Sequence, residues 1–190
     1  MHNRDSLRQK SELARLLQKH MAFRVGGRLR RLLITVVGSL RRATAKAPRD
    51  VDLLVQVPDS AKDIADVLES GVCTAKGAQA PVIARTVACG TRKRSCVVRW
   101  QGRAHKVDFF LARAAERPFA LMHFTGSAAY NIRVRAHAKA RGWRLNQYGV
   151  FEAGGSSMAP RRVRGSSKLR TEKELAAFLG VSWHPPAARI

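Results

Sequence analysis

Short apolar runs, each of strand length and each ending near a turn-forming residue, dominate the first 111 residues of this chain. They predict strands over Arg31–Val37, Val51–Val57, Val82–Ala88, Cys96–Trp100 and His105–Leu111. Gln101-Gly102-Arg103 separates the last two and predicts a hairpin, and Gly90–Ser95 forms the expected tip of a second hairpin. This part of the chain is therefore expected to be built around a sheet.

Helical patterns precede and follow these strands. They predict helices over Asp5–Met21, Ser60–Glu69, Glu116–His123, Ser127–Arg141 and 172–179. The last of these opens with a capping box formed by Thr171 and Glu174. Arg144–Phe151 is expected as a strand and Glu152–Arg170 as a mobile loop. Near residues 112–118 the sequence pattern changes from mainly strands to mainly helices. This change predicts an α+β protein of two parts, 1–112 and 113–190.

The chain is strongly basic, since 36 lysines and arginines against 13 aspartates and glutamates give a formal charge of +23. Such an imbalance indicates a polyanionic partner, either nucleic acid or an acidic membrane surface. A hydrophobic content of 45% is that of a globular protein rather than a disordered basic tail. No apolar run approaches the ~18–20 residues of a membrane span, and Met1–Lys10 has no signal-peptide core, so we expect a soluble cytosolic protein.

Three cysteines without a Cys-x-x-Cys pattern indicate neither a disulfide scaffold nor a zinc site. The expected hairpin brings Cys89 near Cys96, so a disulfide between them is geometrically possible, and free thiols are the alternative.

Asp50 and Asp52 lie at the start of the strand over Val51–Val57. Strand residues two apart share a face, so the α-carbons of the two lie about 6–7 Å apart on one side of the sheet. The two carboxylates repel each other unless a cation lies between them, and Mg²⁺ prefers such oxygen ligands. The alternative is a solvated pair that binds nothing.

Asp108 lies inside the apolar run Lys106–Leu111, where an unpaired carboxylate is costly. If its strand neighbours the one that begins beside Asp50, three carboxylates converge and can hold two divalent ions. That arrangement is typical of in-line phosphoryl transfer. Gly38-Ser39 adds a turn suited to phosphate, because glycine permits close backbone approach and the hydroxyl and amides donate, and Arg42 adds a charged contact.

The expected helix over Ser127–Arg141 has basic and apolar faces. Its basic stripes are Arg133, His137 and Arg141, and beside them Asn131, Arg135 and Lys139, while its apolar side is Ala128, Ala129, Ile132 and Ala136. Two more basic clusters are Arg92, Lys93 and Arg94 in the hairpin tip and Arg161, Arg162 and Arg164 in the loop. Each of these sets either contacts nucleic acid phosphates or is solvated surface charge. Trp183 either stacks on a base or closes the core of the second part.

The pattern of Gly38-Ser39, Asp50, Asp52 and Asp108 resembles the family X DNA polymerases. His123-Phe124-Thr125-Gly126-Ser127 is similar to the Tyr-Phe-Thr-Gly-Ser turn of that family, and Leu145-Asn146-Gln147-Tyr148 to its Leu-Asn-Glu-Tyr segment. The resemblance covers essentially the whole chain and is strongest to compact viral members that consist of palm and thumb. It implies a nucleotidyltransferase palm of mixed sheet and helices over 1–112 and a small α+β thumb over 113–190.

The resemblance also implies roles for individual residues. Asp50, Asp52 and Asp108 bind two Mg²⁺ ions, with Mn²⁺ as a substitute, and Asp108 accepts the proton of the primer 3′-hydroxyl. Gly38, Ser39 and Arg42 hold the triphosphate, the turn of His123, Phe124 and Gly126 packs on the sugar, and Asn131 and Arg135 contact the nascent base pair and the template side. Arg133, His137 and Lys139 bind DNA. Histidine replaces the usual tyrosine at position 123, so sugar selection is expected to differ.

The function implied is filling of short gaps during DNA repair by a monomer that uses dNTPs and gapped or nicked duplex DNA, binds no membrane, and works with a DNA ligase. The expected location is the host-cell cytoplasm or a virion. About thirty residues precede the first palm strand, too few for the domain that carries lyase activity in larger family members, so lyase activity is not expected. The alternatives are a template-independent terminal transferase and a non-catalytic basic DNA-binding protein.

Overall fold

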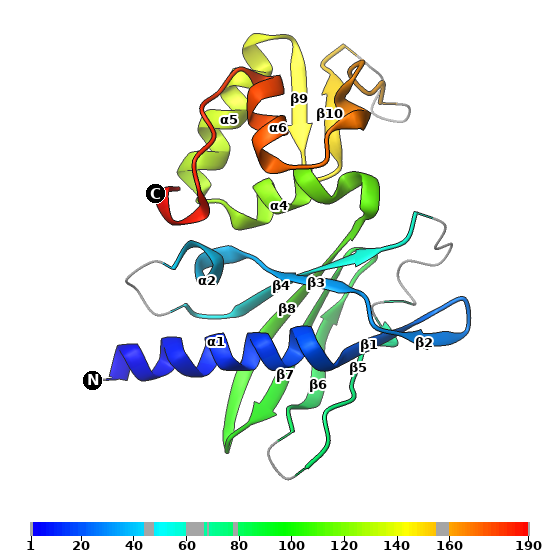
Figure 1. Cartoon of the computed structure of the whole chain (residues 1–190), viewed down its shortest axis with the longest axis vertical. Helices are drawn as coiled ribbons and strands as arrows, with labels where there is room; N and C mark the ends of the chain where they lie inside the picture. The colour runs from blue at the N-terminus through cyan, green and yellow to red at the C-terminus, as the bar shows by residue number, and fades with distance from the viewer. Residues whose placement is uncertain are drawn as a thin grey trace.

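A mixed five-stranded sheet with one long helix across it forms the first part of the chain (Figure 1). The computed structural model describes residues 2–43, 48–59, 67, 69–77, 80–154 and 160–189. The strands of the sheet, in spatial order, are β3 (Leu33–Val36), β4 (Val51–Val57), β8 (Arg103–Arg113), β7 (Lys93–Trp100) and β6 (Val82–Cys89). β4 and β8 are parallel and the other neighbours antiparallel, which confirms the expected mixed sheet.

A second, small sheet was not predicted. It consists of β2 (Arg28–Arg30), β1 (Met21–Val25) and β5 (Val72–Cys73). β1 and β2 form a hairpin over Gly26 and Gly27, both in the left-handed region that glycine tolerates. β2 and β5 have only three and two residues, and every residue of β2 is exposed, so neither carries an apolar run of strand length. The helix expected over Asp5–Met21 is α1 (His2–His20), and the one expected over Ser60–Glu69 lies mostly outside the described residues.

Alternation along the central strands gives the sheet two different faces. One face packs against α1 in a core that includes Leu13, Leu17, Leu53, Val55, Val98, Val107 and Phe109. Burying each of these side chains contributes about 1.5–3 kcal/mol, so this face holds the first part together. Residues between them in sequence, such as Leu54 and Phe110, turn to the other face and pack with residues of α4 (Arg117–Thr125).

The second part of the chain has its own core above the sheet (Figure 1). Its elements are η1 (Ala114–Glu116), α4, α5 (Ala128–Ala140), β9 (Trp143–Asn146), β10 (Gly149–Glu152), η2 (Ser166–Lys168), α6 (Glu172–Leu179) and η3 (Pro186–Ala188). Ser127 caps α5, and Thr171 and Glu174 form the expected capping box of α6. In the part of the chain that the structure describes, no helix combines the length and apolarity needed to cross a membrane.

Two expectations for this second part were wrong. The strand expected over Arg144–Phe151 is a hairpin of β9 and β10, because Asn146 Oδ1 accepts hydrogen bonds from the backbone amides of Tyr148 and Gly149 and turns the chain. The described end of the expected mobile loop, 160–170, is anchored: Val163 is buried in the core, and the backbone of Arg162 pairs with Phe151 of β10.

The second hairpin tip is shorter than expected, because β7 begins at Lys93. Its register places Cys89 opposite Arg94 and Cys96 opposite Thr86, so the two thiols are not cross-strand partners. Both cysteines are free thiols in this structure. Trp183 is 40% exposed and lies outside the core, where Val181 packs instead, so it does not close that core.

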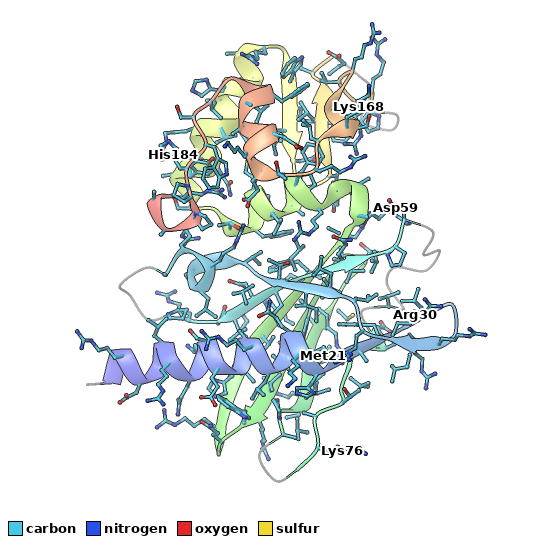
Figure 2. The ribbon with its side chains drawn as sticks, in the orientation of Figure 1. Met21, Arg30, Asp59, Lys76, Lys168 and His184 are labelled. Carbon is cyan, nitrogen blue, oxygen red and sulfur yellow. The ribbon has the colours of Figure 1, made fainter. Side chains whose placement is uncertain are left out.

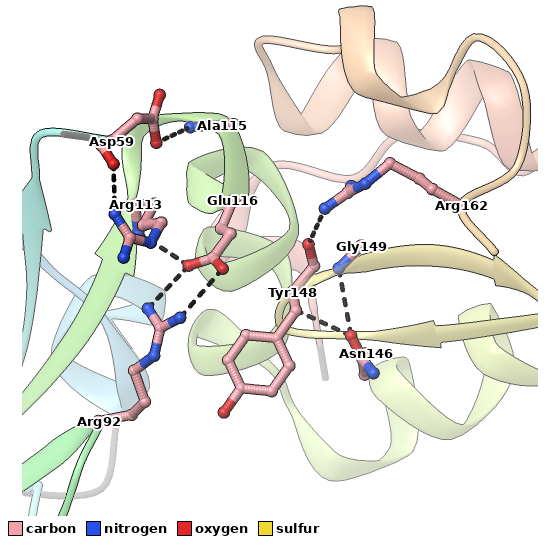
Figure 3. A network of polar contacts seen from close by, with 9 residues as sticks. All are labelled: Asp59, Arg92, Arg113, Ala115, Glu116, Asn146, Tyr148, Gly149 and Arg162. Carbon is pink, nitrogen blue, oxygen red and sulfur yellow. Dashed lines mark hydrogen bonds and ion pairs between the residues drawn. The ribbon is translucent and has the colours of Figure 1, made fainter. Parts of the chain in front are cut away.

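The basic clusters of the tip and the loop serve partly as structure. Arg92 donates to both carboxylate oxygens of Glu116 at 3.0 and 3.2 Å, and its guanidinium lies 5.3 Å from the centroid of the Tyr148 ring (Figure 3). Arg162 donates to the backbone oxygen of Tyr148 at 2.9 Å. Arg94 donates to backbone oxygens of Glu69 and Gly71. The expectation that these three arginines are either phosphate ligands or solvated surface charge therefore needs correction, since each ties protein segments together.

Candidate active site

Asp50 and Asp52 lie at the start of β4, and Asp108 lies in the middle of β8, with Asp52 and Asp108 on the face opposite α1. Asp52 of β4 lies directly beside Asp108 of β8 in the parallel register, so both side chains project from the same face. Asp50 lies two residues before Asp52, just outside the strand. Their burial differs: the Asp50 side chain is 30% exposed and that of Asp108 only 6%. The sheet thus brings together the three acids that the sequence singled out.

The Gly38-Ser39 turn lies against Asp52. The backbone amide of Val37 donates to the carbonyl oxygen of Asp52 at 2.9 Å, which fixes the end of β3 to β4. Gly38 has φ +65°, and a Cβ added there would lie 2.1 Å from Asp52 Oδ2. Only glycine therefore fits this position. Ser39 follows as the second residue of α2 (Gly38–Arg42).

Two lysines that the sequence analysis did not place in the site neutralise the acids. Lys93 Nζ of β7 lies 2.7 Å from Asp108 Oδ2, and Lys106 Nζ of β8 lies 2.8 Å from Asp50 Oδ2. Lys106 was foreseeable, because it lies two residues before Asp108 on the same strand face. The contact of Lys93 depends on the β7–β8 register, which the turn at Gln101 and Gly102 sets by pairing Trp100 with Arg103.

The electrostatics of the site centre on Asp52. Partial burial raises the pKa of Asp52 to about 6, with further contributions from the negative charges of Asp108 and Asp50 that the two lysines partly offset. Hydrogen bonding to Asp50 raises the pKa of Lys106. The site is thus a crowded carboxylate cluster that favours additional positive charge.

The donor set fits hard divalent cations, which take carboxylate oxygens as ligands. Asp108 Oδ1 is buried and has no hydrogen-bond partner among the described residues, as expected of an atom that binds an external group. In that same part of the chain, no three Asp, Glu, His or Cys side chains are already grouped closely enough to hold an ion. The three carboxylates would therefore have to move closer together to share one ion.

Several residues that the sequence predicted to bind the nucleotide lie together at the C-terminal end of α4. Arg42 donates to the backbone oxygen of Thr125, and a Cβ added at Gly126 would lie 3.4 Å from Arg42 Nη1 and 3.7 Å from Asn131 Nδ2. Asn131 Nδ2 also donates to the His123 backbone oxygen at 2.8 Å. The predicted residues Arg42, His123, Gly126 and Asn131 are thus neighbours.

His123 faces a small cavity beside the site. It is lined by Phe119, Met122, His123, Asn131, Arg135, Leu145 and Asn146. Arg135 Nη2 lies 2.8 Å from His123 Nδ1, and burial together with the Arg135 charge lowers the pKa of the imidazole. The neutral ring accepts a hydrogen bond from the guanidinium in this geometry. Phe124 stacks on Phe110 of β8 with ring centroids 4.2 Å apart, which connects this group to the sheet.

Two of the remaining predicted residues of α5 lie on another face of the helix. Arg133 and His137 line a groove together with His184, on a different face from Asn131, while Lys139 is exposed. The apolar side expected for this helix was wrong: Ala128, Ala129, Ile132 and Ala136 are exposed, and Tyr130, Val134 and Ala138 are buried. Tyrosine and valine bury more apolar surface than alanine, so the face that carries them turns inward.

Comparison with known proteins identifies the family of this chain. Residues 120–190 match the DNA polymerase beta thumb family. Repair DNA polymerase X of African swine fever virus (isolate Tick/Malawi/Lil 20-1/1983) is 36% identical over 97% of this chain and 99% of the viral protein. DNA polymerase/3′-5′ exonuclease PolX of Bacillus subtilis (strain 168) is 32% identical over 80% of this chain and 23% of its own length.

Solved structures share the fold. The Leishmania infantum polymerase beta ternary primer/template complex has a TM-score of 0.64 and 21% identity, covering 98% of this chain and 75% of its own. The ternary gap complex of the same enzyme has a TM-score of 0.65 and 20% identity, covering 98% and 69%. The chain belongs to the family X DNA polymerases. It is a DNA-directed DNA polymerase of the repair type.

Proposed function

We propose that this family X polymerase fills short gaps by transferring a nucleotide from a dNTP to a primer 3′-hydroxyl. The observation that carries the proposal is the parallel register that sets Asp52 beside Asp108, with the Gly38 backbone against Asp52. Residues 1–112 are the palm and 113–190 the thumb, a division supported by their separate hydrophobic cores. The Leishmania relative has been solved with primer/template and with gapped DNA, which supports the same substrates here.

Asp50, Asp52 and Asp108 are the proposed ligands of two Mg²⁺ ions, with Mn²⁺ as a substitute. When bound, the ions supply charge neutralisation of the triphosphate and activation of the primer 3′-hydroxyl. Asp108 also takes the proton from that hydroxyl, for which its buried Oδ1, without a hydrogen-bond partner among the described residues, is suited. The primer oxygen then attacks the α-phosphorus and pyrophosphate leaves.

The nucleotide is held by groups on both sides of this cluster. Gly38, Ser39 and Arg42 bind the triphosphate, and Arg42 Nε, which is buried without a partner among the described residues, suits a phosphate oxygen. The sugar packs on the turn of His123, Phe124 and Gly126, and Asn131 contacts the base pair.

DNA binding is assigned to α5 and to the overall charge. Arg135 contacts the template side, and Arg133, His137 and Lys139 contact the backbone. Because phosphate contacts position DNA without reading its sequence, affinity should be independent of sequence and should fall steeply with salt. Gap filling leaves a nick, so a DNA ligase has to act next. The similarity to a viral protein supports two locations, the host-cell cytoplasm or the virion.

The test is primer extension on a one-nucleotide gap with Mg²⁺ and each dNTP in turn. We expect incorporation of the complementary nucleotide, and loss of extension with retained DNA binding for Asp108→Asn. Asp5→Asn, which changes an exposed aspartate on α1, is the matched control and should extend normally. Tailing that ignores the template base would favour a terminal transferase. DNA binding without any extension would favour a non-catalytic DNA-binding protein.

A further inference from the structure

Lys93 makes the shortest ion pair with a buried acid of the proposed metal site. Its ammonium lies 2.7 Å from Asp108 Oδ2, where the aspartate side chain is 6% exposed and that of the lysine 48%. Burying a carboxylate this deeply is costly unless an opposite charge or several hydrogen-bond donors compensate it. In the metal-free protein Lys93 supplies that charge directly.

The sheet geometry aims Lys93 at this position. Lys93 is the first residue of β7 and lies opposite Phe110 of β8, while Ser95 lies opposite Asp108. Directly opposed residues of antiparallel strands share a face, so Lys93 stands on the face that carries the aspartates. Its ammonium also lies 5.1 Å from the Phe110 ring centroid, a cation–π contact that holds the side chain over the site.

Lys106 provides a contrast on the same face. Its ammonium pairs with the more exposed Asp50 at 2.8 Å and is 3.9 Å from Asp108 Oδ2. Lys93 therefore neutralises the buried acid, and Lys106 mainly the acid at the rim. A divalent ion bound to Asp108 would lie close to the Lys93 ammonium, which contacts the same carboxylate. Two positive charges this close repel each other strongly in a partly buried site.

We propose that Lys93 is a positioning residue that occupies the cation position at Asp108 and lowers the affinity of the free enzyme for divalent ions. The inference rests on the proposed function, which makes Asp108 a metal ligand. A lysine suits this task because its ammonium is a point charge on a flexible stem, and half exposure lets it swing into solvent when a metal binds. The lysine competes with the metal and takes no part in the chemical step.

The test measures Mn²⁺ binding to the DNA-free protein at about pH 8, with free Mn²⁺ followed by electron paramagnetic resonance. Lys93→Met should tighten Mn²⁺ binding about tenfold, because the competing charge is gone. Lys93→Arg, which keeps the charge, should stay within about twofold of the parent protein. Lys76→Met is the matched control, since Lys76 lies at the far end of the sheet from the second part of the chain (Figure 2), and it should leave affinity unchanged.

The outcomes separate this inference from the proposed function. Unchanged or weaker Mn²⁺ binding by Lys93→Met, with a normal thermal unfolding curve, overturns the inference alone. If Lys93→Met tightens binding, adding Asp108→Asn should abolish the gain. A gain that survives Asp108→Asn means that the ion binds elsewhere, and that result overturns the assignment of Asp108 as well. As a second measurement, Lys93→Met should lower the Mg²⁺ concentration for half-maximal extension, whereas a merely structural role would not.

Discussion

The carboxylate of Glu172, at the start of α6, lies 2.5 Å from the guanidinium of Arg41 in α2. This ion pair joins the two parts of the molecule, because α2 follows the Gly38-Ser39 turn and α6 belongs to the second core. Glu172 also pairs at 2.7 Å with Arg189, whose side chain is fully buried. One carboxylate thus compensates a buried arginine and connects α2, after the Gly38-Ser39 turn, to the C-terminal part.

Glu172→Gln should destabilise the protein strongly. Arg189 would keep its buried charge without a counter-ion, which costs about 3–5 kcal/mol in comparable sites. Urea unfolding measures the change. Asp5→Asn is the control and should unfold like the parent protein. A loss of stability no larger than that of the control would mean that the buried pair is not a determinant of stability.

Gly38→Ala should impair catalysis far more than folding. The added methyl group would overlap Asp52 Oδ2 and displace it, and a misplaced catalytic group costs about 100-fold in rate, while the left-handed conformation adds about 1–2 kcal/mol of strain. Single-nucleotide incorporation kinetics and thermal unfolding are the measurements. Gly154→Ala is the matched control, since a Cβ there meets nothing within 4 Å. Near-normal kcat/KM for Gly38→Ala would contradict the proposed role of Asp52 in catalysis.

Stability should fall in mild acid partly because of His105. This side chain is 6% exposed, and burial together with the Lys10 charge lowers the pKa of its imidazole. The unfolded chain takes up a proton near pH 6.5 while the folded protein does not, so the free energy of unfolding decreases as pH drops from about 7 to 5. His105→Phe should show a smaller decrease over that range in urea titrations. Parallel pH profiles for the two proteins would refute the assignment.

Arg92→Ala tests whether the basic hairpin tip serves structure or DNA. The substitution leaves Glu116, whose side chain is 12% exposed, without its bidentate partner and should cost about 1–3 kcal/mol of stability. The slope of log affinity against log salt should not change, whereas loss of a phosphate contact lowers it by about 1. Arg135→Ala is the comparison, with the lower salt slope expected of a DNA contact. Normal stability with a reduced slope for Arg92→Ala would reverse the assignment.

Local patterns predicted much of this protein correctly. Alternation in Val51–Val57 put Asp50 and Asp52 on one face, a lone acid in an apolar strand singled out Asp108, and the capping box located the start of α6. These features depend on side-chain periodicity and on residues a few positions apart, so the local sequence determines them.

Strand registers decided the rest. That Asp108 lies beside Asp52 depends on the pairing of β4 and β8, which are distant in sequence. That Lys93 reaches Asp108 and that Cys96 faces Thr86 depends on the exact registers of two hairpins. The same applies to the inward face of α5 and to the buried Arg189, because which surface turns inward depends on the total apolar area available across the whole domain. Side-chain periodicity is short-ranged, whereas strand register and burial are properties of the assembled fold.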